Sequence, residues 1–384
     1  MIDVRKKSDC CGCGVCVDSC PIRCISMQND AEGFCYPKVD KSKCINCNLC
    51  TNRCPIINST EKKDNYISGF VARSYDATRN ESSSGGIFYL IAKYVIIQRG
   101  IVVGAAFDSE WNVHHICIDR LDRINDLLGS KYVQSSTCGV FQQIKSRLDD
   151  DRLVLFSGTG CQIAALKSFL CHDYSNLLTV DILCHGVPSP KVWRIYLNSV
   201  KNEFSSDIQK VTFRDKRDGW HNYSNTIRLS SGQIVTSVFT SNLYMNMFLS
   251  NFSLRPSCYN CRFKGLERTS DLTIGDAWGI EKVMPDFDDD KGTSLVIVHS
   301  SKGEKILKWI SNSVEMREVD IDSILPRTAD SRMSVHVPET RAIFMYYLKH
   351  GKSITKLIEC MNLENNIRVR IKNRFLRIFL RNSI

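Results

Sequence analysis

The sequence lacks the features that mark secreted and membrane-spanning proteins. Its first residues, MIDVRKKSDCCGCG, contain no apolar segment of the kind that a secretory signal requires. One longer apolar stretch, residues 85–107, is interrupted by Lys93, Gln98, Arg99 and Gly100. We predict a buried helix followed by a strand there, with a membrane span as the alternative. We therefore expect a cytoplasmic protein, and at roughly 150 residues per domain its 384 residues allow two to three domains.

A basic stripe across the folded body is also missing. The formal net charge is +10, but residues 362–384 hold six basic residues against one glutamate and so carry half of the excess. A nucleic-acid-binding domain would present its basic residues on a folded face, so no nucleic-acid partner is expected. Residues 341–384 are predicted as a basic amphipathic tail for a membrane surface or a partner. A terminal helix packed on the body is the alternative.

Cysteine, by contrast, is abundant, and its number, 19, is odd. Without a secretory signal, this argues against a disulfide framework and for metal ligation in a reducing compartment. Residues 10–21 and 44–55 both follow the pattern CxxCxxCxxxCP, the bacterial ferredoxin spacing for 4Fe–4S clusters, in which the fourth cysteine ligates the other cluster. A pair of structural zinc sites, which need CxxC with a distant CxxC or HxxxH, is the alternative. The predicted ligands are Cys10, Cys13, Cys16 and Cys54 for one cluster, and Cys44, Cys47, Cys50 and Cys20 for the other, which leaves Cys11 unassigned.

Apolar strands alternate with helices in the second half of the chain. A strand at 152–156 leads through a tight turn to a helix at 161–170, and a strand at 177–183 leads to a helix at 190–204. This alternation predicts a parallel sheet, and a hairpin predicted among later strands makes it mixed. The predicted fold is an α/β core with a mixed sheet, behind an N-terminal ferredoxin-like dicluster domain. The predicted divisions are 1–64 for the ferredoxin-type domain, ending in a linker at 61–64, 65–150 and 151–340 for the two parts of the core, and 341–384 for the tail.

Four further cysteines are scattered but fall at informative positions. Cys161 begins a predicted helix and Cys184 ends a predicted strand, so neighbouring parallel strands would place both at the carboxyl edge of the sheet, where ligands bind. Cys258 and Cys261 form a CxxC pair. These four thiols predict a third 4Fe–4S cluster. A zinc site, a redox disulfide or a lone nucleophile at Cys161 remain alternatives.

Two polar features lie beside these elements. Residues 83–86, Ser-Ser-Gly-Gly, precede a predicted helix and could cradle a phosphate on backbone amides. Taken alone, this motif favours an ordinary serine helix cap. His185, in a turn between a strand and prolines, is either a proton donor or a residue that only hydrogen-bonds the loop backbone.

Taken together, these motifs resemble the coenzyme F420 hydrogenase/dehydrogenase beta subunit family. The likeness runs from residue 10 to about 330 and departs from the usual pattern at Gly160, often proline, and at Ala277, often aromatic. It implies bound FAD and iron–sulfur clusters, with Cys161, Cys184, Cys258 and Cys261 as ligands of the cluster beside the flavin. It also implies that FAD is held by Ser84, Gly85, Gly86, Lys131, Gln134 and Ser135. The segments that carry it are SSGG at 83–86, GSKYVQS at 129–135, GTGCQIA at 158–164, CHGVPSP at 184–190, FRDK at 213–216 and SDLTIGD at 270–276.

The function predicted from these features is an iron–sulfur flavoprotein oxidoreductase. Electrons would pass between a ferredoxin or other redox protein and a two-electron substrate or cofactor, through the clusters and FAD. The family spans F420 enzymes, chlorophyll-pathway reductases and proteins resembling those found with surface-polysaccharide genes, so a bacterial surface-polysaccharide pathway is one setting. The alternatives are a non-catalytic electron-transfer subunit serving a partner reductase or hydrogenase, and a zinc-stabilised binding protein. The sequence indicates no catalytic residue, substrate or oligomeric state.

Overall fold

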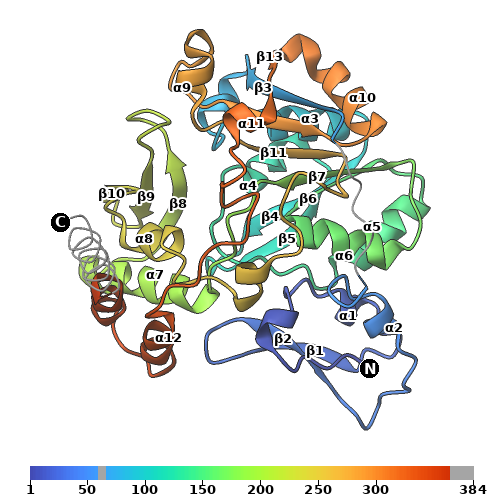
Figure 1. The fold of residues 1–384 in the computed structure, drawn as a ribbon, viewed down its shortest axis with the longest axis vertical. Helices are drawn as coiled ribbons and strands as arrows, with labels where there is room; N and C mark the ends of the chain where they lie inside the picture. The colour runs from blue at the N-terminus through green and yellow to red at the C-terminus, as the bar shows by residue number, and fades with distance from the viewer. Residues whose placement is uncertain (59–65, 364–384) are drawn as a thin grey trace, which may run out of the picture.

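The computed structural model describes residues 1–58 and 66–363. The linker predicted at 61–64 and residues 364–384 of the predicted tail lie outside these ranges. An eight-stranded sheet in the order β13-β3-β12-β11-β7-β6-β4-β5 forms the centre (Figure 1). Its strands are β3 (Ser68–Ser74), β4 (Ile101–Phe107), β5 (Val113–Ile118), β6 (Val154–Gly158), β7 (Leu177–Ile182), β11 (Leu272–Asp276), β12 (Ser294–Val298) and β13 (Val314–Glu318).

The strands β4, β6, β7 and β11 run parallel, and the outer strands of the sheet are antiparallel. The predicted mixed sheet is therefore confirmed. The predicted hairpin, however, is not part of it. It pairs with β8 in a separate three-stranded sheet, because its apolar side chains pack on helices outside the main sheet. That sheet consists of β8 (Ile208–Asp215), β9 (Ser224–Leu229) and β10 (Ile234–Val238).

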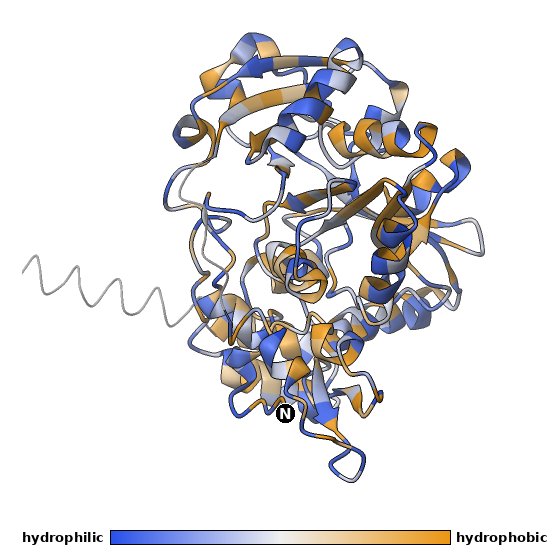
Figure 2. Ribbon diagram, turned by 90° about the vertical axis from the view of Figure 1, so that its right-hand side faces the viewer, coloured by the Kyte–Doolittle hydropathy of each residue, from blue (hydrophilic) through white to orange (hydrophobic). Residues whose placement is uncertain are grey.

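Helices cover both faces of the large sheet. Val154, Leu155 and Phe156 of β6 are fully buried, as expected for a strand with helices on both sides. Figure 2 shows the central strands as mainly apolar and the helices as mixed, which fits one buried side per helix. One face packs against α3 (Ile87–Ile97) and α10 (Ser301–Ile310), and the other against α5 (Val140–Asp149) and α6 (Gly160–Leu170).

The predicted apolar stretch at 85–107 forms the buried helix α3 and the strand β4. No helix within residues 1–58 and 66–363 is long and apolar enough to span a bilayer. The smaller sheet lies on a second apolar core with α7 (Pro190–Phe204), α8 (Leu243–Leu249) and α12 (Arg341–Lys349). Three short helices border the large sheet, namely α4 (Ile124–Leu127), α9 (Ile280–Val283) and α11 (Ile321–Ile324).

The cysteine-rich N-terminal module packs against the sheet-covering helices at the lower end of Figure 1. It contains α1 (Val15–Asp18), α2 (Leu49–Asn52) and the hairpin of β1 (Ile25–Asn29) and β2 (Cys35–Val39). The buried carboxylate of Asp18 accepts hydrogen bonds from the amides of Gly139, at 2.7 Å, and Phe141, at 3.1 Å, at the start of α5. The module is thus attached to the core by polar contacts as well as by packing.

Candidate functional site

The structure brings together the first predicted set of four cysteines, named here the Cys10 group (Cys10, Cys13, Cys16 and Cys54). Cys10 and Cys13 lie on the loop leading into α1, Cys16 lies within α1, and Cys54 follows α2. Burial, and then repulsion from Cys10 and Cys54, raises the pKa of Cys16. Four thiolates this close repel one another unless a cation lies among them, so the donor set suits a positively charged metal centre.

The second set, the Cys20 group (Cys20, Cys44, Cys47 and Cys50), lines a small cavity beside Ile22 and Ile45. Two backbone amides point at its sulfurs. The amide of Ile2 donates to Cys50 Sγ at 3.2 Å, and that of Cys24 donates to Cys20 Sγ at 3.3 Å. Amide donors of this kind stabilise thiolate and tune iron–sulfur clusters.

The third set, the Cys161 group (Cys161, Cys184, Cys258 and Cys261), converges from three distant segments. Because β6 and β7 are parallel neighbours, Cys161 at the start of α6 and Cys184 after β7 meet at the carboxyl edge. The other two come from the 3-10 helix η4 (Pro256–Asn260) and the residue after it. Burial, and then the charges of Cys258, Cys161 and Cys261, raises the pKa of Cys184. The amide of Val187 donates to Cys258 Sγ at 3.4 Å.

Cys11, which has no place in the sequence prediction, lies between two of these groups. Its thiol interacts with both Cys13 of the Cys10 group and Cys161 of the Cys161 group. Hydrogen bonding to Cys13 raises the pKa of Cys11, and the contact with Cys161 opposes that rise. A doubled cysteine inside a CxxC is the only sequence signal that could have singled it out.

A cavity of about 610 Å³ opens at the carboxyl edge of the parallel strands, a volume within the range typical of ligand sites. Cys184 lines it, so the Cys161 group borders the cavity directly. Four of the six residues predicted to hold FAD also line it, namely Ser84, Gly86, Lys131 and Ser135.

The other two predicted residues are not among the lining residues. Gly85 packs against the backbone, where a Cβ would lie 2.3 Å from the carbonyl oxygen of Ala72. The side chain of Gln134 donates to the carbonyl of Cys11 at 3.2 Å and accepts from Arg255 at 3.0 Å. Both stay predictions for FAD, but the side chain of Gln134 is engaged by Cys11 and Arg255.

The start of α3 borders the cavity without the serine cap that the motif alone favours. Its N-cap is Gly86, at φ +83°, and no side chain in the described ranges caps the first amides of the helix. Ser83 instead accepts from the amide of Ser130 at 2.7 Å, and Ser84 donates to the carbonyl of Thr293 at 2.8 Å. The two serine side chains therefore bond to neighbouring segments and not to the first amides of α3. The N-terminus of the helix can consequently bind an anion.

His115, a residue that sequence reasoning missed, closes one side of the cavity. Its Nδ1 lies 2.6 Å from Ser135 Oγ and its Nε2 lies 3.0 Å from the carbonyl oxygen of Ser157. The carbonyl accepts only, so Nε2 carries the proton and Ser135 donates to Nδ1. Burial lowers the pKa of His115 to about 4, which keeps the ring neutral. Its inward position in the alternation of β5 is the signal that could have identified it.

Arg214 and two aromatic side chains also line the cavity. The guanidinium is buried and bonds to both carboxylate oxygens of Asp276, at 2.9 and 3.1 Å. It lies 4.0 Å from the ring centre of Tyr223 and 5.0 Å from that of Trp278. Trp278 is 41% exposed yet stacks on buried Trp220 at 4.4 Å. An exposed, rigidly held indole at a cavity wall is suited to stacking on a planar ligand.

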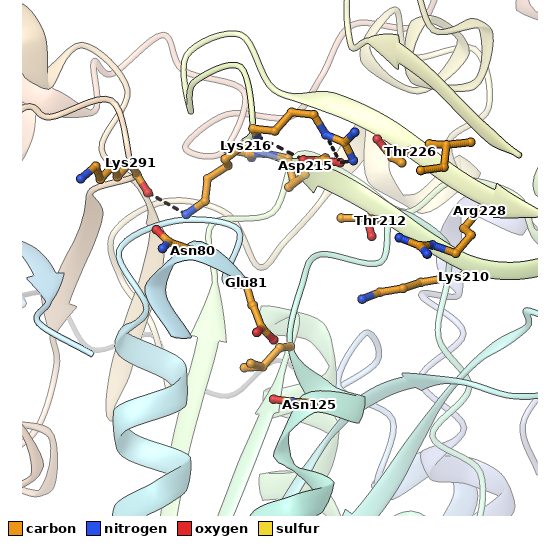
Figure 3. Close-up of a pocket in the computed structure, with 14 residues that line it drawn as sticks. Asn80, Glu81, Asn125, Lys210, Thr212, Asp215, Lys216, Thr226, Arg228 and Lys291 are labelled. Carbon is orange, nitrogen blue, oxygen red and sulfur yellow. Dashed lines mark hydrogen bonds and ion pairs between the residues drawn. The ribbon is translucent and has the colours of Figure 1, made fainter. Parts of the chain in front are cut away.

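A second cavity, of about 530 Å³, shares Arg214 and Leu128 with the first. Figure 3 shows Lys210 and Arg228 on one side and the loop of Asn80 and Glu81 on the other. No ion pair of Lys210, Arg228 or Lys291 occurs in the part of the chain that the structure describes. The basic residues that line the cavity are Lys210, Arg214, Lys216, Arg217, Arg228 and Lys291.

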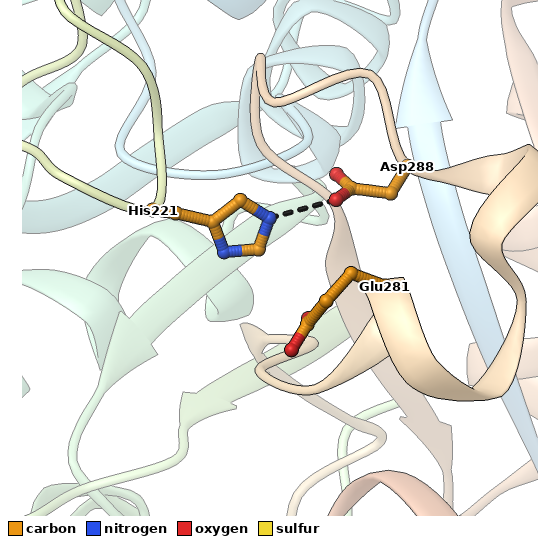
Figure 4. A group of neighbouring side chains, drawn as sticks. All are labelled: His221, Glu281 and Asp288. Carbon is orange, nitrogen blue, oxygen red and sulfur yellow. Dashed lines mark hydrogen bonds and ion pairs between the residues drawn. The ribbon is translucent and has the colours of Figure 1, made fainter.

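A histidine–carboxylate group lies beyond Trp220, with His221 and Asp288 outside the helices and Glu281 in α9. His221 Nε2 is 2.7 Å from Asp288, and Glu281 offers a further ligand atom, all within 4.8 Å of one another (Figure 4). The contact between His221 and Asp288 joins the β8–β9 loop to the segment before β12. This hydrogen bond accounts for the positions of the His221 and Asp288 side chains.

Two lysines should make anion binding at these cavities pH-dependent. Burial lowers the pKa of Lys131 to about 7, and burial with the charges of Arg79 and Arg214 lowers that of Lys216 to about 7. A bound anion favours the ammonium form. Below pH 7 both lysines are already charged, so affinity should be constant. Above pH 7, binding of an anion at Lys131 in the first cavity, or at Lys216 in the second, must take up one proton. The affinity of each cavity for an anion should therefore fall by up to about tenfold per pH unit.

Fluorescence titration of the flavin-free protein with FAD, the anion expected from the family resemblance, measures this dependence at the first cavity between pH 6 and 9. Lys131→Met should remove the slope, whereas the matched variant Lys145→Met, on the exposed side of α5, should retain it. A wild-type affinity that stays constant over this range would show that Lys131 does not contact the anion.

Comparison with known proteins gives a family match and a structural one. The family model that describes the C-terminal part of the coenzyme F420 hydrogenase/dehydrogenase beta subunit matches residues 151–323. No curated protein matches the chain. Among solved structures, a chain of the F420-reducing [NiFe] hydrogenase complex from Methanosarcina barkeri is similar, with 16% sequence identity and a TM-score of 0.47. The similarity covers 79% of this chain and 94% of that one.

Proposed function

Because residues 151–323 belong to the coenzyme F420 hydrogenase/dehydrogenase beta subunit family, we propose that this protein is an iron–sulfur flavoprotein oxidoreductase. One observation carries the proposal. Three groups of four cysteines follow one another from the N-terminal module to a ligand-sized cavity, and the last group borders that cavity. Such a series suits one-electron transfer toward a bound redox cofactor.

Each cysteine group would hold one 4Fe–4S cluster. The Cys20 group lies nearest to exposed apolar side chains, since Ile45 is 62% exposed and Ile22 is 39% exposed. A ferredoxin or another redox protein would exchange electrons there. The Cys10 group would receive the electron next. The Cys11 thiol, which interacts with both Cys13 and Cys161, would lie on the path from the Cys10 group to the Cys161 group.

FAD would occupy the 610 Å³ cavity. The amides at the start of α3 and Lys131 would hold its phosphates, and Trp278 offers a surface for a planar ring. A flavin exchanges single electrons with clusters and electron pairs with substrates, which is the chemistry that joins the two kinds of partner. His115, held neutral by burial, and Ser135 would supply hydrogen bonds without adding charge.

The adjoining basic cavity would receive the substrate. The cations that line it, among them Lys210, Arg228 and Lys291, suit a substrate that carries phosphate or carboxylate groups. A cavity of this kind within the same chain favours an enzyme over a subunit that only passes electrons to a partner.

The test is anaerobic purification with assays of iron, acid-labile sulfide and flavin. We expect about twelve irons, about twelve sulfides and one FAD per chain. Reduced ferredoxin should then bleach the flavin absorbance, and anionic two-electron oxidants should restore it faster than neutral ones. A colourless protein that contains zinc would refute the proposal. A flavin that reacts with oxidants only after a partner chain is added would favour the electron-transfer subunit.

A further inference from the structure

Arg255 is one of the largest fully buried side chains in the described structure, with no exposed surface. Its guanidinium lies against the Cys10 group. Nε donates to the carbonyl of Cys10 at 2.7 Å, and Nη2 donates to the carbonyl of Cys35 at 2.9 Å and approaches Cys10 Sγ at 3.5 Å. Nη1 donates to Gln134 Oε1 at 3.0 Å. The cation is therefore held at every nitrogen.

No carboxylate forms an ion pair with Arg255 within residues 1–58 and 66–363, in contrast to the buried Arg214 and Arg268, which pair with Asp276 and Asp181. A buried arginine without an anion is strongly unfavourable. The anionic atoms available to it are sulfurs. Its charge interacts with those of Cys10, Cys11 and Cys258.

The same residue also reaches the Cys161 group. Arg255 immediately precedes η4, the 3-10 helix that carries Cys258, and its carbonyl accepts a hydrogen bond from the amide of Cys258 at 2.9 Å. Its own amide donates to the carbonyl of Val187 at 3.0 Å, and the amide of Val187 donates to Cys258 Sγ. Arg255 is therefore bonded through its backbone to the segments of the Cys161 group and through its guanidinium to the Cys10 group.

The surroundings hold the guanidinium in this position. It lies 4.4 Å from the ring centre of Tyr36 and 5.4 Å from that of Phe34. On its other side is Gly12, at φ +74°, where a Cβ would lie 2.7 Å from Nη1. Glycine between Cys11 and Cys13 therefore admits the guanidinium to the loop that presents the sulfurs.

We propose that Arg255 is the shared counter-ion of the Cys10 and Cys161 groups, and that its fixed charge raises the reduction potentials of the clusters held there above that of the Cys20 group. This inference rests on the proposed function. A nearby cation stabilises the more negative, reduced cluster. An electron that enters at the Cys20 group is thereby drawn inward, past Cys11, toward the cavity. Arg255 is a positioning residue in this scheme, since it touches cluster ligands and not the substrate.

Potentiometric titration of the loaded protein, followed by electron paramagnetic resonance, tests the proposal. Arg255→Gln should make reduction of the clusters at the Cys10 and Cys161 groups at least about tenfold less favourable, or about 59 mV lower for a one-electron couple. Arg255→Lys keeps the charge and should stay close to wild type. Gln134→Glu places a carboxylate at Nη1 without changing side-chain size and should lower the same potentials.

The control is Arg73→Gln, which removes an arginine paired with Glu315 far from the cysteine groups and should leave all potentials unchanged. Unchanged potentials in loaded Arg255→Gln would overturn the proposal, as would an equal shift in Arg255→Lys, which would indicate packing instead of charge. If Arg255→Gln does not retain iron, the Gln134→Glu variant is the test instead. Unchanged cluster potentials in Gln134→Glu would overturn the proposal. Absence of sulfide from the wild-type protein would instead refute the proposed function.

Discussion

Replacing Cys184 and Cys258 together by alanine is expected to lower the iron content from about twelve to about eight per chain. The two substitutions remove half of the Cys161 group, and the two remaining thiolates are too few to retain a cubane cluster. Because this group borders the cavity, bound flavin should remain but should no longer be reduced through the N-terminal module. Rapid mixing with reduced ferredoxin, followed at the flavin absorbance band, measures the loss.

The matched control is Cys171→Ala. Cys171 is exposed, follows α6 and donates to carbonyls of its own helix, so iron content and flavin reduction should both be unchanged. Retention of about twelve irons in the double variant would show that the Cys161 group holds no cluster. Retention of flavin reduction at eight irons would show that electrons reach the cavity by another route.

Replacing Arg214 by methionine is expected to lower the free energy of unfolding by roughly 3–5 kcal/mol. The substitution leaves Asp276 without its guanidinium at the wall of the cavity, where the remaining donor is Trp220 Nε1 at 3.1 Å. Burial by itself would lower the pKa of the Arg214 guanidinium. The charge of Asp276 outweighs burial and holds that pKa above its ordinary value, so the two side chains stabilise each other's charged forms. Anaerobic urea unfolding, followed by tryptophan fluorescence, measures the change.

A double-mutant cycle separates the ion pair from packing. Asp276→Asn alone should also destabilise the protein, and the double variant Arg214→Met with Asp276→Asn should recover part of the loss, because no unpaired charge remains. Strictly additive effects would contradict coupling between the two. A loss below about 1 kcal/mol for Arg214→Met would place the pair in the range of exposed ion pairs.

Local patterns in the sequence were sufficient for the elements and for the cysteine groups of the N-terminal module. The strands predicted at 152–156 and 177–183 correspond to β6 (Val154–Gly158) and β7 (Leu177–Ile182), because their apolar and β-branched side chains favour a buried strand. The CxxCxxCxxxCP runs indicate ligands because cluster chemistry requires that spacing within a few residues of chain. The helix at 190–204 is likewise set by the capping Ser189 and by Pro190 at its first position.

Contacts between distant segments were decided by the tertiary structure. Arg255 lies 245 residues from Cys10 in sequence, and neither residue's neighbours indicate that the two meet. Gln134 belongs to a motif that implies flavin binding, yet its side chain bonds to Cys11 and Arg255. The Ser-Ser-Gly-Gly motif predicts a serine cap, but the serines bond to loops that pack beside them and leave the helix start open.

The physical reason is the range of the interactions. Strand and helix formation and ligand spacing depend on residues within one or two turns of each other, so the sequence alone determined the α/β alternation and the spacing of the N-terminal cysteines. The partner of a buried charge and the residues around a cavity depend on how the sheets and helices pack. Only the folded chain, therefore, placed a buried arginine between two groups of thiols and a cavity beside the second.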